Sequence, residues 1–380
     1  MSKNKKIKIV FTGGGTAGHI FPIIAVAREI RRLGLDTDFF YLGPEDAFGS
    51  ILLSQEDIKM KAILAGKIRR YWTWQSVFQN IADVLFKTPL GLLQSFFYVF
   101  FLTPDLIFSK GGYGSIGPVI AGWILQIPIF IHEADIAPGL ANRFLGRFGS
   151  QIFVSFPVDQ TEYFSEDKML SVGNPIRREL FAGSGEAAKK LFDLQGAKPL
   201  VLVLGGSQGA QKINDAILTI LPEFLTHFEL IHQTGEKNFK EVTEEARVVI
   251  NKELEKYYHP SPFLNEIELR EALAVANLVV GRAGSGGIFE IAALGKPSIL
   301  IPLSISAQNH QVKNGYAYAK NGAALVIEEA NLTPRFFLEK LKYLFSHSEE
   351  LEKMAAGAKS FAKPEAAKTI AQYIINYLTK

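Results

Sequence analysis

Residues 7–22, IKIVFTGGGTAGHIFP, combine an apolar strand, a glycine-rich turn and the start of a helix. Residues 200–210, LVLVLGGSQGA, repeat the strand and the glycine turn in the second half of the chain. In such turns the glycines let the backbone approach a ligand, and the unpaired N–H groups of the helix start point at negative charge. Two turns of this kind predict two nucleotide-binding folds that face each other across a cleft.

The length of 380 residues exceeds what one hydrophobic core usually serves, so we expect more than one domain. Short apolar runs alternate with helical stretches such as Ile20–Leu33, which predicts α/β folding with doubly wound parallel sheets covered on both faces. The polar segment Gly173–Lys198 is predicted to be a linker, and the helix Lys363–Leu378 to pack back on the first domain. The expected division is 1–172, 173–361 and a returning segment 362–380. The predicted strands are Ile7–Phe11, Asp38–Leu42, Leu106–Ser109, Ile129–His132, Leu200–Leu204, Glu229–Gln233, Leu278–Val280 and Ser298–Pro302.

Composition excludes several classes of function. The net charge of +3 is too small to indicate a nucleic-acid partner, and the basic residues are spread along the chain. The sequence contains no cysteine, which excludes disulfide and thiolate chemistry and suits the cytosol. The run Ile7–Phe11 is too short for a signal-peptide core, so we expect a cytoplasmic protein.

The first glycine turn also matches the dinucleotide pattern G-x-G-x-x-G over Gly13–Gly18. A nicotinamide enzyme would carry an acid at the tip of its second strand to hold a ribose. Here the second strand ends in Gly43 and Pro44, so a dinucleotide cofactor is disfavoured. The D-x-D sequence at residues 36–38 precedes its strand and is interpreted as a turn rather than a metal site.

Several short motifs, in order along nearly the whole chain, resemble those of the MurG family, the UDP-N-acetylglucosamine:N-acetylmuramyl-(pentapeptide) pyrophosphoryl-undecaprenol N-acetylglucosaminyltransferases. The resemblance implies a GT-B fold with an N-terminal acceptor domain and a C-terminal nucleotide-sugar domain. It also implies inverting transfer of N-acetylglucosamine from its UDP derivative to lipid I, which forms lipid II for peptidoglycan, without a metal or other cofactor. The matching motifs are residues 14–22 (GGTAGHIFP), 111–113 (GGY), 132–133 (HE), 139–143 (GLANR), 173–177 (GNPIR), 205–210 (GGSQGA), 290–293 (EIAA) and 311–314 (QVKN).

Two residues are candidates for the catalytic base. Inverting transfer is a single in-line displacement that needs a base for the acceptor hydroxyl and positive potential for the departing UDP. His19 follows the first glycine turn and titrates in the right range, so it is the first candidate. A histidine there can instead bond the backbone or contact pyrophosphate or sugar. Glu133 is the second candidate, and its alternative is a strand-end carboxylate that positions its neighbours.

The resemblance also implies a donor site. Glu290 corresponds to the residue that holds the ribose hydroxyls, although a helix acid in a favourable dipole is the alternative. Leu264 corresponds to a position whose backbone reads uracil, but its side chain alone indicates core packing. Gln311 corresponds to a sugar contact and Arg177 to a guanidinium near the cleft, while hydroxyls and backbone N–H groups of the glycine turns correspond to pyrophosphate contacts. The predicted donor-binding residues are Thr16, Ala17, Gly18, Asp135, Arg177, Ser207, Leu264, Ser285, Gly286, Gly287, Glu290 and Gln311.

The sequence departs from the family pattern at two positions. Asp135 stands where the family's His-Glu-Gln-Asn motif has an amide that contacts the sugar, and Gln308 stands where an acid is common. These changes leave the donor sugar open. Related GT-B enzymes glycosylate diacylglycerol, so transfer from a UDP-sugar to that or another lipid is the alternative function. A non-catalytic partner subunit that presents a membrane surface is disfavoured, because both half-sites lie on this chain.

One segment bears on the lipid-linked acceptor. Lys67–Trp74 combines cations with aromatic residues, and Leu90–Leu102 is rich in Phe, Leu and Tyr. The apolar stretch is too short to span a bilayer and lies between Pro89 and Pro104, so no membrane-spanning helix is expected. The segment fits either an ordinary buried helix or a helix that lies in an anionic membrane surface through residues 67–102. The second interpretation predicts a peripheral protein on the cytoplasmic face of the cell membrane.

Overall fold

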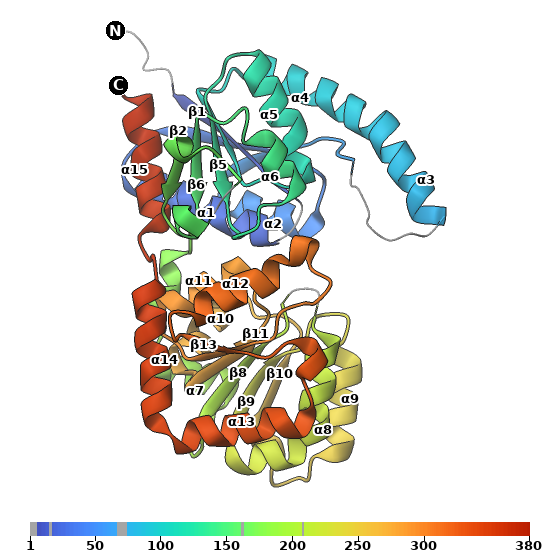
Figure 1. Ribbon diagram of the computed structural model, residues 1–380, viewed down its shortest axis with the longest axis vertical. Helices are drawn as coiled ribbons and strands as arrows, with labels where there is room; N and C mark the ends of the chain where they lie inside the picture. The colour runs from blue at the N-terminus through green and yellow to red at the C-terminus, as the bar shows by residue number, and fades with distance from the viewer. Residues whose placement is uncertain (1–5, 15–16, 67–73, 161–162, 207–208) are drawn as a thin grey trace. The chain divides into compact units, whose positions relative to one another are not determined.

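The computed structural model describes residues 6–14, 17–66, 74–160, 163–206 and 209–380. The chain forms two compact units, the first comprising Met1–Arg177 with Pro364–Lys380 and the second Arg178–Lys363 (Figure 1). The first boundary lies after Arg177 rather than after residue 172. The reason is that the backbone oxygen of Gly173 and the side chain of Asn174 bond to residues at the end of the first sheet.

Among the described residues, the first unit is built on a seven-stranded parallel sheet of order β3-β2-β1-β4-β5-β6-β7. Its strands are β1 (Ile7–Thr12), β2 (Thr37–Gly43), β3 (Ile58–Ala62), β4 (Leu106–Ser109), β5 (Ile129–Glu133), β6 (Gln151–Val154) and β7 (Met169–Ser171). Its helices are α1 (Ala17–Arg32), α2 (Ala47–Gln55), α3 (Trp74–Ala82), α4 (Thr88–Leu102), α5 (Ile116–Ile124), α6 (Leu140–Leu145) and α15 (Ala366–Leu378). The sequence prediction of a doubly wound α/β fold is confirmed.

Both faces of this sheet are covered, which explains why its central strands are largely apolar. Ile9 and Phe11 of β1 face α1 and α15, whereas Val10 faces the layer that contains α4, α5 and α6. The C-terminal helix α15 contributes Ile370 and Ile374 to the same core as α1.

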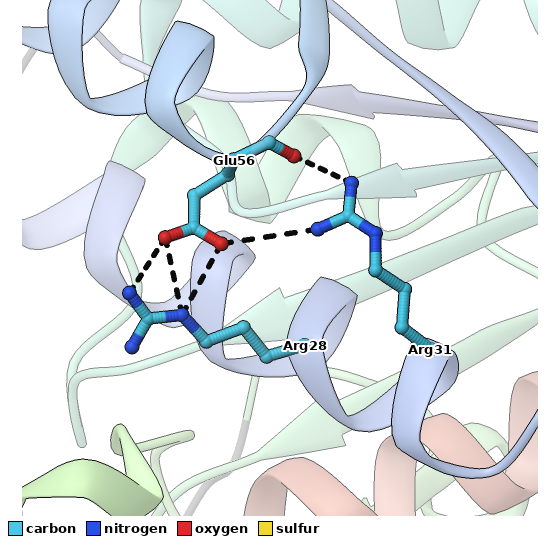
Figure 2. A network of polar contacts seen from close by, with 3 residues as sticks. All are labelled: Arg28, Arg31 and Glu56. Carbon is cyan, nitrogen blue, oxygen red and sulfur yellow. Dashed lines mark hydrogen bonds and ion pairs between the residues drawn. The ribbon is translucent and has the colours of Figure 1, made fainter.

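An arginine clasp holds α1 against the end of α2 (Figure 2). The Arg28 guanidinium donates to the carboxylate of Glu56 at 2.6 Å through NH2 and at 3.1 Å through Nε. Arg31, one turn further along α1, donates to the backbone oxygen of Glu56. Because α1 carries the glycine turn at its start, this clasp fixes the position of the helix that follows the turn.

The helical segment before β4 is longer than the sequence analysis expected, and its burial decides between the two interpretations left open there. The helix continues from Phe78 to Leu102 through a π-helical stretch, Asp83–Lys87, and by length and composition alone it is long enough and apolar enough to cross a membrane. Only 17% of its most apolar window is buried, so it is not an ordinary core helix. Figure 1 shows the α3 end standing clear of the sheet.

The other end of this helix is docked on its own unit. Gly91, Ser95 and Val99 form the buried side of α4. A Cβ on Gly91 would lie 1.8 Å from the backbone oxygen of Leu64, and one on Gly117 of α5 would lie 2.3 Å from the Ser95 hydroxyl. Small residues therefore let α4 approach α5 and the chain after β3, while its other sides remain exposed.

The second unit repeats the architecture with a parallel sheet of order β10-β9-β8-β11-β12-β13. Its strands are β8 (Leu200–Leu204), β9 (Glu229–Gln233), β10 (Tyr258–Ser261), β11 (Leu278–Gly281), β12 (Ser298–Leu300) and β13 (Ala324–Val326). Its helices are α7 (Gly185–Phe192), α8 (Gln211–His227), α9 (Phe239–Val249), α10 (Glu266–Val275), α11 (Ser285–Ala293), α12 (His310–Ala319), α13 (Pro334–Ser346) and α14 (Ser348–Phe361).

The expected linker Gly173–Lys198 is wrong in part, because residues 185–192 form α7. The Ser184 side chain accepts a hydrogen bond from the backbone at the start of this helix, and Ala188 is fully buried in the core below α10. The backbone N–H of Ser184 also donates to the Glu271 carboxylate of α10 at 2.6 Å. The sequence analysis missed this helix because its small and charged residues resemble the composition of a loop.

Candidate active site

The sheet order of the first unit reverses between β1 and β4, and open parallel sheets bind ligands beside the carboxyl ends of the strands at such a switch point. The loops that follow these two strands touch each other. Gly112, after β4, has a φ of 82°, and a Cβ there would lie 3.1 Å from the backbone nitrogen of Gly14, after β1. Glycine is required at Gly112 for both reasons.

His19 lies in the first turn of α1, beside both loops. A Cβ on Gly14 would lie 2.9 Å from the imidazole Cε1, and one on Gly112 would lie 3.1 Å from Nε2. Burial, followed by the positive charge of Lys110, lowers the pKa of His19 to about 4, and the negative charge of Asp135 opposes this shift only in part. The imidazole is therefore uncharged at neutral pH.

Glu133 ends β5 and is 4% exposed. Its Oε1 accepts the backbone N–H of Asp135 at 2.9 Å, and its Oε2 accepts Nδ2 of Asn142, on α6, at 2.8 Å. Burial, followed by the charge of Asp135, raises the pKa of Glu133 toward neutrality, while the two hydrogen bonds and Lys110 lower it. The structure thus brings His19, Glu133 and Asp135 to one edge of one sheet.

Lys110, for which the sequence analysis suggested no role, lies at the centre of this edge. It follows β4, is 3% exposed, and its Nζ is 2.7 Å from Nδ1 of His132 and 3.1 Å from Oδ1 of Asn174. Nε2 of His132 lies 3.0 Å from the backbone oxygen of Gly173. Because an ammonium only donates and a carbonyl only accepts, the network assigns His132 as a neutral ring protonated on Nε2.

Arg177 lies at the end of the first unit, where its side chain is buried. The guanidinium stacks over the ring of Phe21 in α1, 4.0 Å from the ring centroid. This cation–π contact ties the residue at which the chain leaves the first unit to the helix that carries His19. The donor contact implied for Arg177 stays a prediction.

The second unit has its own switch point, between β8 and β11. A Cβ on Gly205 would lie 2.7 Å from the backbone oxygen of Gln233, and Gly206 has a φ of 75°, so the turn requires glycine at both positions. Two predicted contacts, Ser207 and Thr16, lie outside the described residues. Ala17 and Gly18, which follow Thr16, begin α1 in the first unit.

The loop after β11 brings Ser285, Gly286 and Gly287 into the first turn of α11. Among the described residues, nothing lies within 4 Å of a Cβ built on Gly286 or Gly287, and the turn contains no acid. A helix start with this free space and positive end of its dipole is suited to a phosphate group. The structure therefore gathers three predicted pyrophosphate contacts at the switch point.

The remaining donor candidates lie on neighbouring elements of the same unit. Glu290 is half-buried on α11, one turn after its start, and Gln311 is half-buried near the start of α12. Oε1 of Gln311 accepts the backbone N–H of Leu303 at 2.9 Å, so this amide also fixes the loop after β12. Leu264 is 2% exposed in the core, as its side chain indicated, and its proposed backbone contact stays a prediction.

An ion pair that the sequence analysis missed supports the loop before α11. Arg282 follows β11, and its NH2 lies 2.6 Å from Oε1 of Glu329, while its NH1 donates to the backbone oxygen of Ile301. The hydroxyl of Ser304 donates to the same carboxylate at 3.0 Å. The three loops after β11, β12 and β13 are thereby joined. The sequence signal that could have revealed this role is the position of Arg282, directly after a strand and before a glycine turn.

Within the ranges that the structure describes, no group of three or more His, Cys, Asp or Glu side chains is placed to hold a metal ion. The acids of the D-x-D sequence, Asp36 and Asp38, instead lie 3.3 Å each from Nζ of Lys6.

Comparison with known families identifies the chain. The profile of the glycosyltransferase family 28 N-terminal domain matches residues 9–154, and that of the C-terminal domain matches residues 200–370. A curated relative from Clostridium tetani, named UDP-N-acetylglucosamine--N-acetylmuramyl-(pentapeptide) pyrophosphoryl-undecaprenol N-acetylglucosamine transferase, is 36% identical over 91% of this chain and 92% of its own length. A Treponema denticola relative of the same name is 33% identical over 98% of each chain. The chain belongs to glycosyltransferase family 28 and, within it, to the MurG family.

Solved structures agree with this membership of the MurG family at the level of the fold. The Acinetobacter baumannii MurG structure has a TM-score of 0.72 at 23% identity and covers 97% of this chain and 99% of its own. A UDP-GlcNAc 2-epimerase from Neisseria meningitidis, solved bound to UDP-GlcNAc, has a TM-score of 0.66 at 15% identity over 97% of this chain and 100% of its own. The predicted GT-B-like, two-domain α/β fold is confirmed.

Proposed function

We propose that this chain is an inverting glycosyltransferase that transfers N-acetylglucosamine from UDP-N-acetylglucosamine to lipid I, forming lipid II. The observation that carries this proposal is its likeness, over more than nine-tenths of its length, to relatives named for that reaction. A built switch-point site in each unit supports it, because transfer needs one site for a donor and one for an acceptor.

The donor is assigned to the second unit. The open first turn of α11 is suited to the pyrophosphate, and Glu290 lies one turn further along the same helix, where a carboxylate can accept from both ribose hydroxyls. Backbone N–H groups can stabilise the leaving UDP without a divalent ion. We therefore propose metal-independent transfer.

The acceptor is assigned to the first unit, with Glu133 as the base. The acceptor oxygen forms a bond to the anomeric carbon while the bond from that carbon to the UDP oxygen breaks, and the hydroxyl proton passes to the base. A base works best when its pKa lies near the working pH. The pKa of Glu133 is raised toward that range, whereas that of His19 is lowered to about 4. This favours Glu133 for proton transfer and a neutral, hydrogen-bonding role for His19.

A lipid-linked acceptor requires a membrane surface, and the helix α3–α4 supplies a suitable face. Trp74 is 82% exposed, Phe78 67% and Phe101 77%. Asp83, within this helix, is buried and paired with Lys87, so the exposed sides of the described helix are mainly apolar. An exposed apolar helix face of this kind is suited to lie in a bilayer interface. We propose peripheral docking on the cytoplasmic face; Lys67–Thr73, the cationic stretch just before Trp74, falls outside the described residues.

The direct test is a parallel assay of the purified protein with UDP-N-acetylglucosamine and either lipid I or diacylglycerol, in the presence of EDTA and with products identified by mass spectrometry. Transfer to lipid I alone is the expected result. Glycosylation of diacylglycerol instead would establish the alternative acceptor, and loss of activity in EDTA that magnesium restores would contradict metal independence.

A further inference from the structure

A lysine is buried where the first unit assembles its site. Lys110 is 3% exposed and follows β4 at the switch point, and its backbone N–H donates to the backbone oxygen of Thr12 at the end of β1 at 2.8 Å. The side-chain partners within hydrogen-bond distance of its Nζ are a ring nitrogen of His132 and an amide oxygen of Asn174, both neutral. The ammonium is thus held in place by groups that do not neutralise it.

Burying an ammonium is unfavourable unless opposite charge lies close. The opposite charges that favour the charged form of Lys110 are the carboxylates of Glu133 and Asp135, and burial opposes them by lowering the pKa of Lys110. His132 holds Lys110 through Nδ1 and is itself fixed by the oxygen of Gly173 through Nε2. This arrangement fixes the ammonium beside His132, whose neighbour on β5 is Glu133.

We propose that Lys110 is a positioning residue that keeps the Glu133 carboxylate ionised and ready to accept the acceptor's proton. This inference rests on the proposed glycosyl transfer with Glu133 as base. It also suggests why an acid at Asp135 is tolerated beside Glu133, since the charge of one ammonium is shared by both carboxylates. His132, with both ring nitrogens engaged, holds the ammonium and takes no proton itself.

The groups that face Glu133 set the sign of the expected effect. Lys110 favours the carboxylate, Asp135 disfavours it, and Asn142 favours it by donating to Oε2. His19 and His132 both have pKa values lowered by burial first and by Lys110 second, so they add no positive charge at neutral pH. Removing the ammonium therefore raises the pKa of Glu133.

The experiment compares Lys110→Met with wild type in the pH dependence of kcat and of kcat/KM for lipid I. The acidic limb should move to higher pH, because the charge of Lys110 is one of the influences that lower the pKa of Glu133. Turnover should fall at neutral pH and recover at higher pH, with the KM for UDP-N-acetylglucosamine unchanged. Lys110→Arg should keep the limb near its wild-type position. A profile of Lys110→Met that is lowered equally at every pH would overturn the proposal.

The matched control is Lys8→Met. Lys8 lies on β1 at the opposite end of the same sheet, where its Nζ donates to the backbone oxygen of Leu102 at 2.9 Å. Its loss should affect stability without moving the pH profile.

An infrared titration tests the same inference without substrate. The infrared band of a protonated carboxyl group that Glu133→Gln removes is present at low pH. As the pH rises, this band should disappear before pH 8 in wild type and persist to higher pH in Lys110→Met. A band that persists above pH 8 in wild type would overturn the proposal even if Lys110→Met fails to fold. Wild-type protein that transfers nothing to lipid I would instead overturn the proposed function, and the infrared result would still decide whether Lys110 controls Glu133.

Discussion

Single residues decide which group takes the proton. Glu133→Gln keeps the size of the side chain but cannot accept a proton, so we expect turnover to fall about 10²–10⁴-fold, the usual contribution of a positioned base. His19→Gln should raise the KM for lipid I more than it lowers kcat, because we propose that His19 forms a hydrogen bond in the acceptor site and does not take the proton. Wild-type kcat/KM should fall as pH drops through the neutral range; an acidic limb near pH 4 that vanishes in His19→Gln would assign the base to His19 instead.

His232 in the second unit makes a separate prediction about stability. It is fully buried, its ring nitrogens lie 3.0 Å from Oδ1 of Asn214 and 3.1 Å from the hydroxyl of Tyr258, and burial lowers its pKa to about 3. Below about pH 6.5, the imidazole of His232 binds a proton in the unfolded chain, whereas in the folded protein it stays neutral until the pH approaches 3. Stability is thus complete above pH 6.5 and lost as pH falls toward 3, by up to about 1.4 kcal/mol per pH unit.

Chemical denaturation between pH 4 and pH 7 measures this slope. His232→Gln should flatten it, while His227→Gln, at an exposed position of α8, should leave it unchanged. An equal slope in wild type and His232→Gln would place the acid sensitivity elsewhere.

How far the sequence predicts the site also depends on particular residues. His19 and Glu133 were singled out because each follows a predicted apolar strand, and Ser285–Gly287 because of the resemblance to the MurG family. Their roles in the site stay predictions. Lys110 and Arg282 follow strands as well, yet their roles depend on distant partners. The partners of Lys110 lie 22 and 64 positions away in the chain, and the carboxylate that pairs with Arg282 lies 47 positions away. No local pattern shows such pairs.

At the scale of elements, α11 makes a prediction about the donor. Glu290→Gln removes the charge that we propose accepts the ribose hydroxyls, and UDP binding should weaken by about 1.5–3 kcal/mol, the range for hydrogen bonds to charged groups. Isothermal titration calorimetry measures the change. Glu245→Gln, on the exposed side of α9, is the control. Unchanged affinity for UDP in Glu290→Gln would mean that Glu290 does not hold the ribose and is only an acidic residue favoured by the helix dipole.

The helix α4 makes a prediction about the membrane. Phe97 and Phe101 are 55% and 77% exposed, and replacing both with Ser should reduce sedimentation with anionic liposomes while UDP binding is kept. The control is Val248→Ser with Ile267→Ser in the second unit, where the exposed fractions are 85% and 57%. Equal loss in both double variants would indicate unspecific adhesion.

Strands were predicted best where a short apolar run lay between polar residues or glycines. Leu106–Ser109, Leu200–Leu204 and Glu229–Gln233 have the predicted bounds, because each contains such a run, as buried parallel strands usually do. The helix α7 was missed, since eight residues with one buried alanine carry little apolar signal. The exposure of α4 was left open, because an apolar helix has the same composition in a core and in a membrane surface.

At the scale of the whole molecule, the two units have separate cores and should respond separately to ligand. UDP at about 100 times its Kd should stabilise the unit that binds it by about 2.7 kcal/mol. In differential scanning calorimetry without divalent metal, we therefore expect UDP to raise the Tm of one transition, and Glu290→Gln to weaken this shift. An equal shift with NADH would contradict a UDP-sugar site.

The placement of α15 has a consequence for how the protein is made. During synthesis, residues 178–363 leave the ribosome as one uninterrupted segment, so the second unit can close its core at once. The first unit emerges earlier, but it cannot complete its core until Ile370 and Ile374, which cover the apolar side of α1, are translated after the second unit. Until then α1 has an uncovered face on which chaperones can act. The unit that begins the chain is therefore the last to be completed.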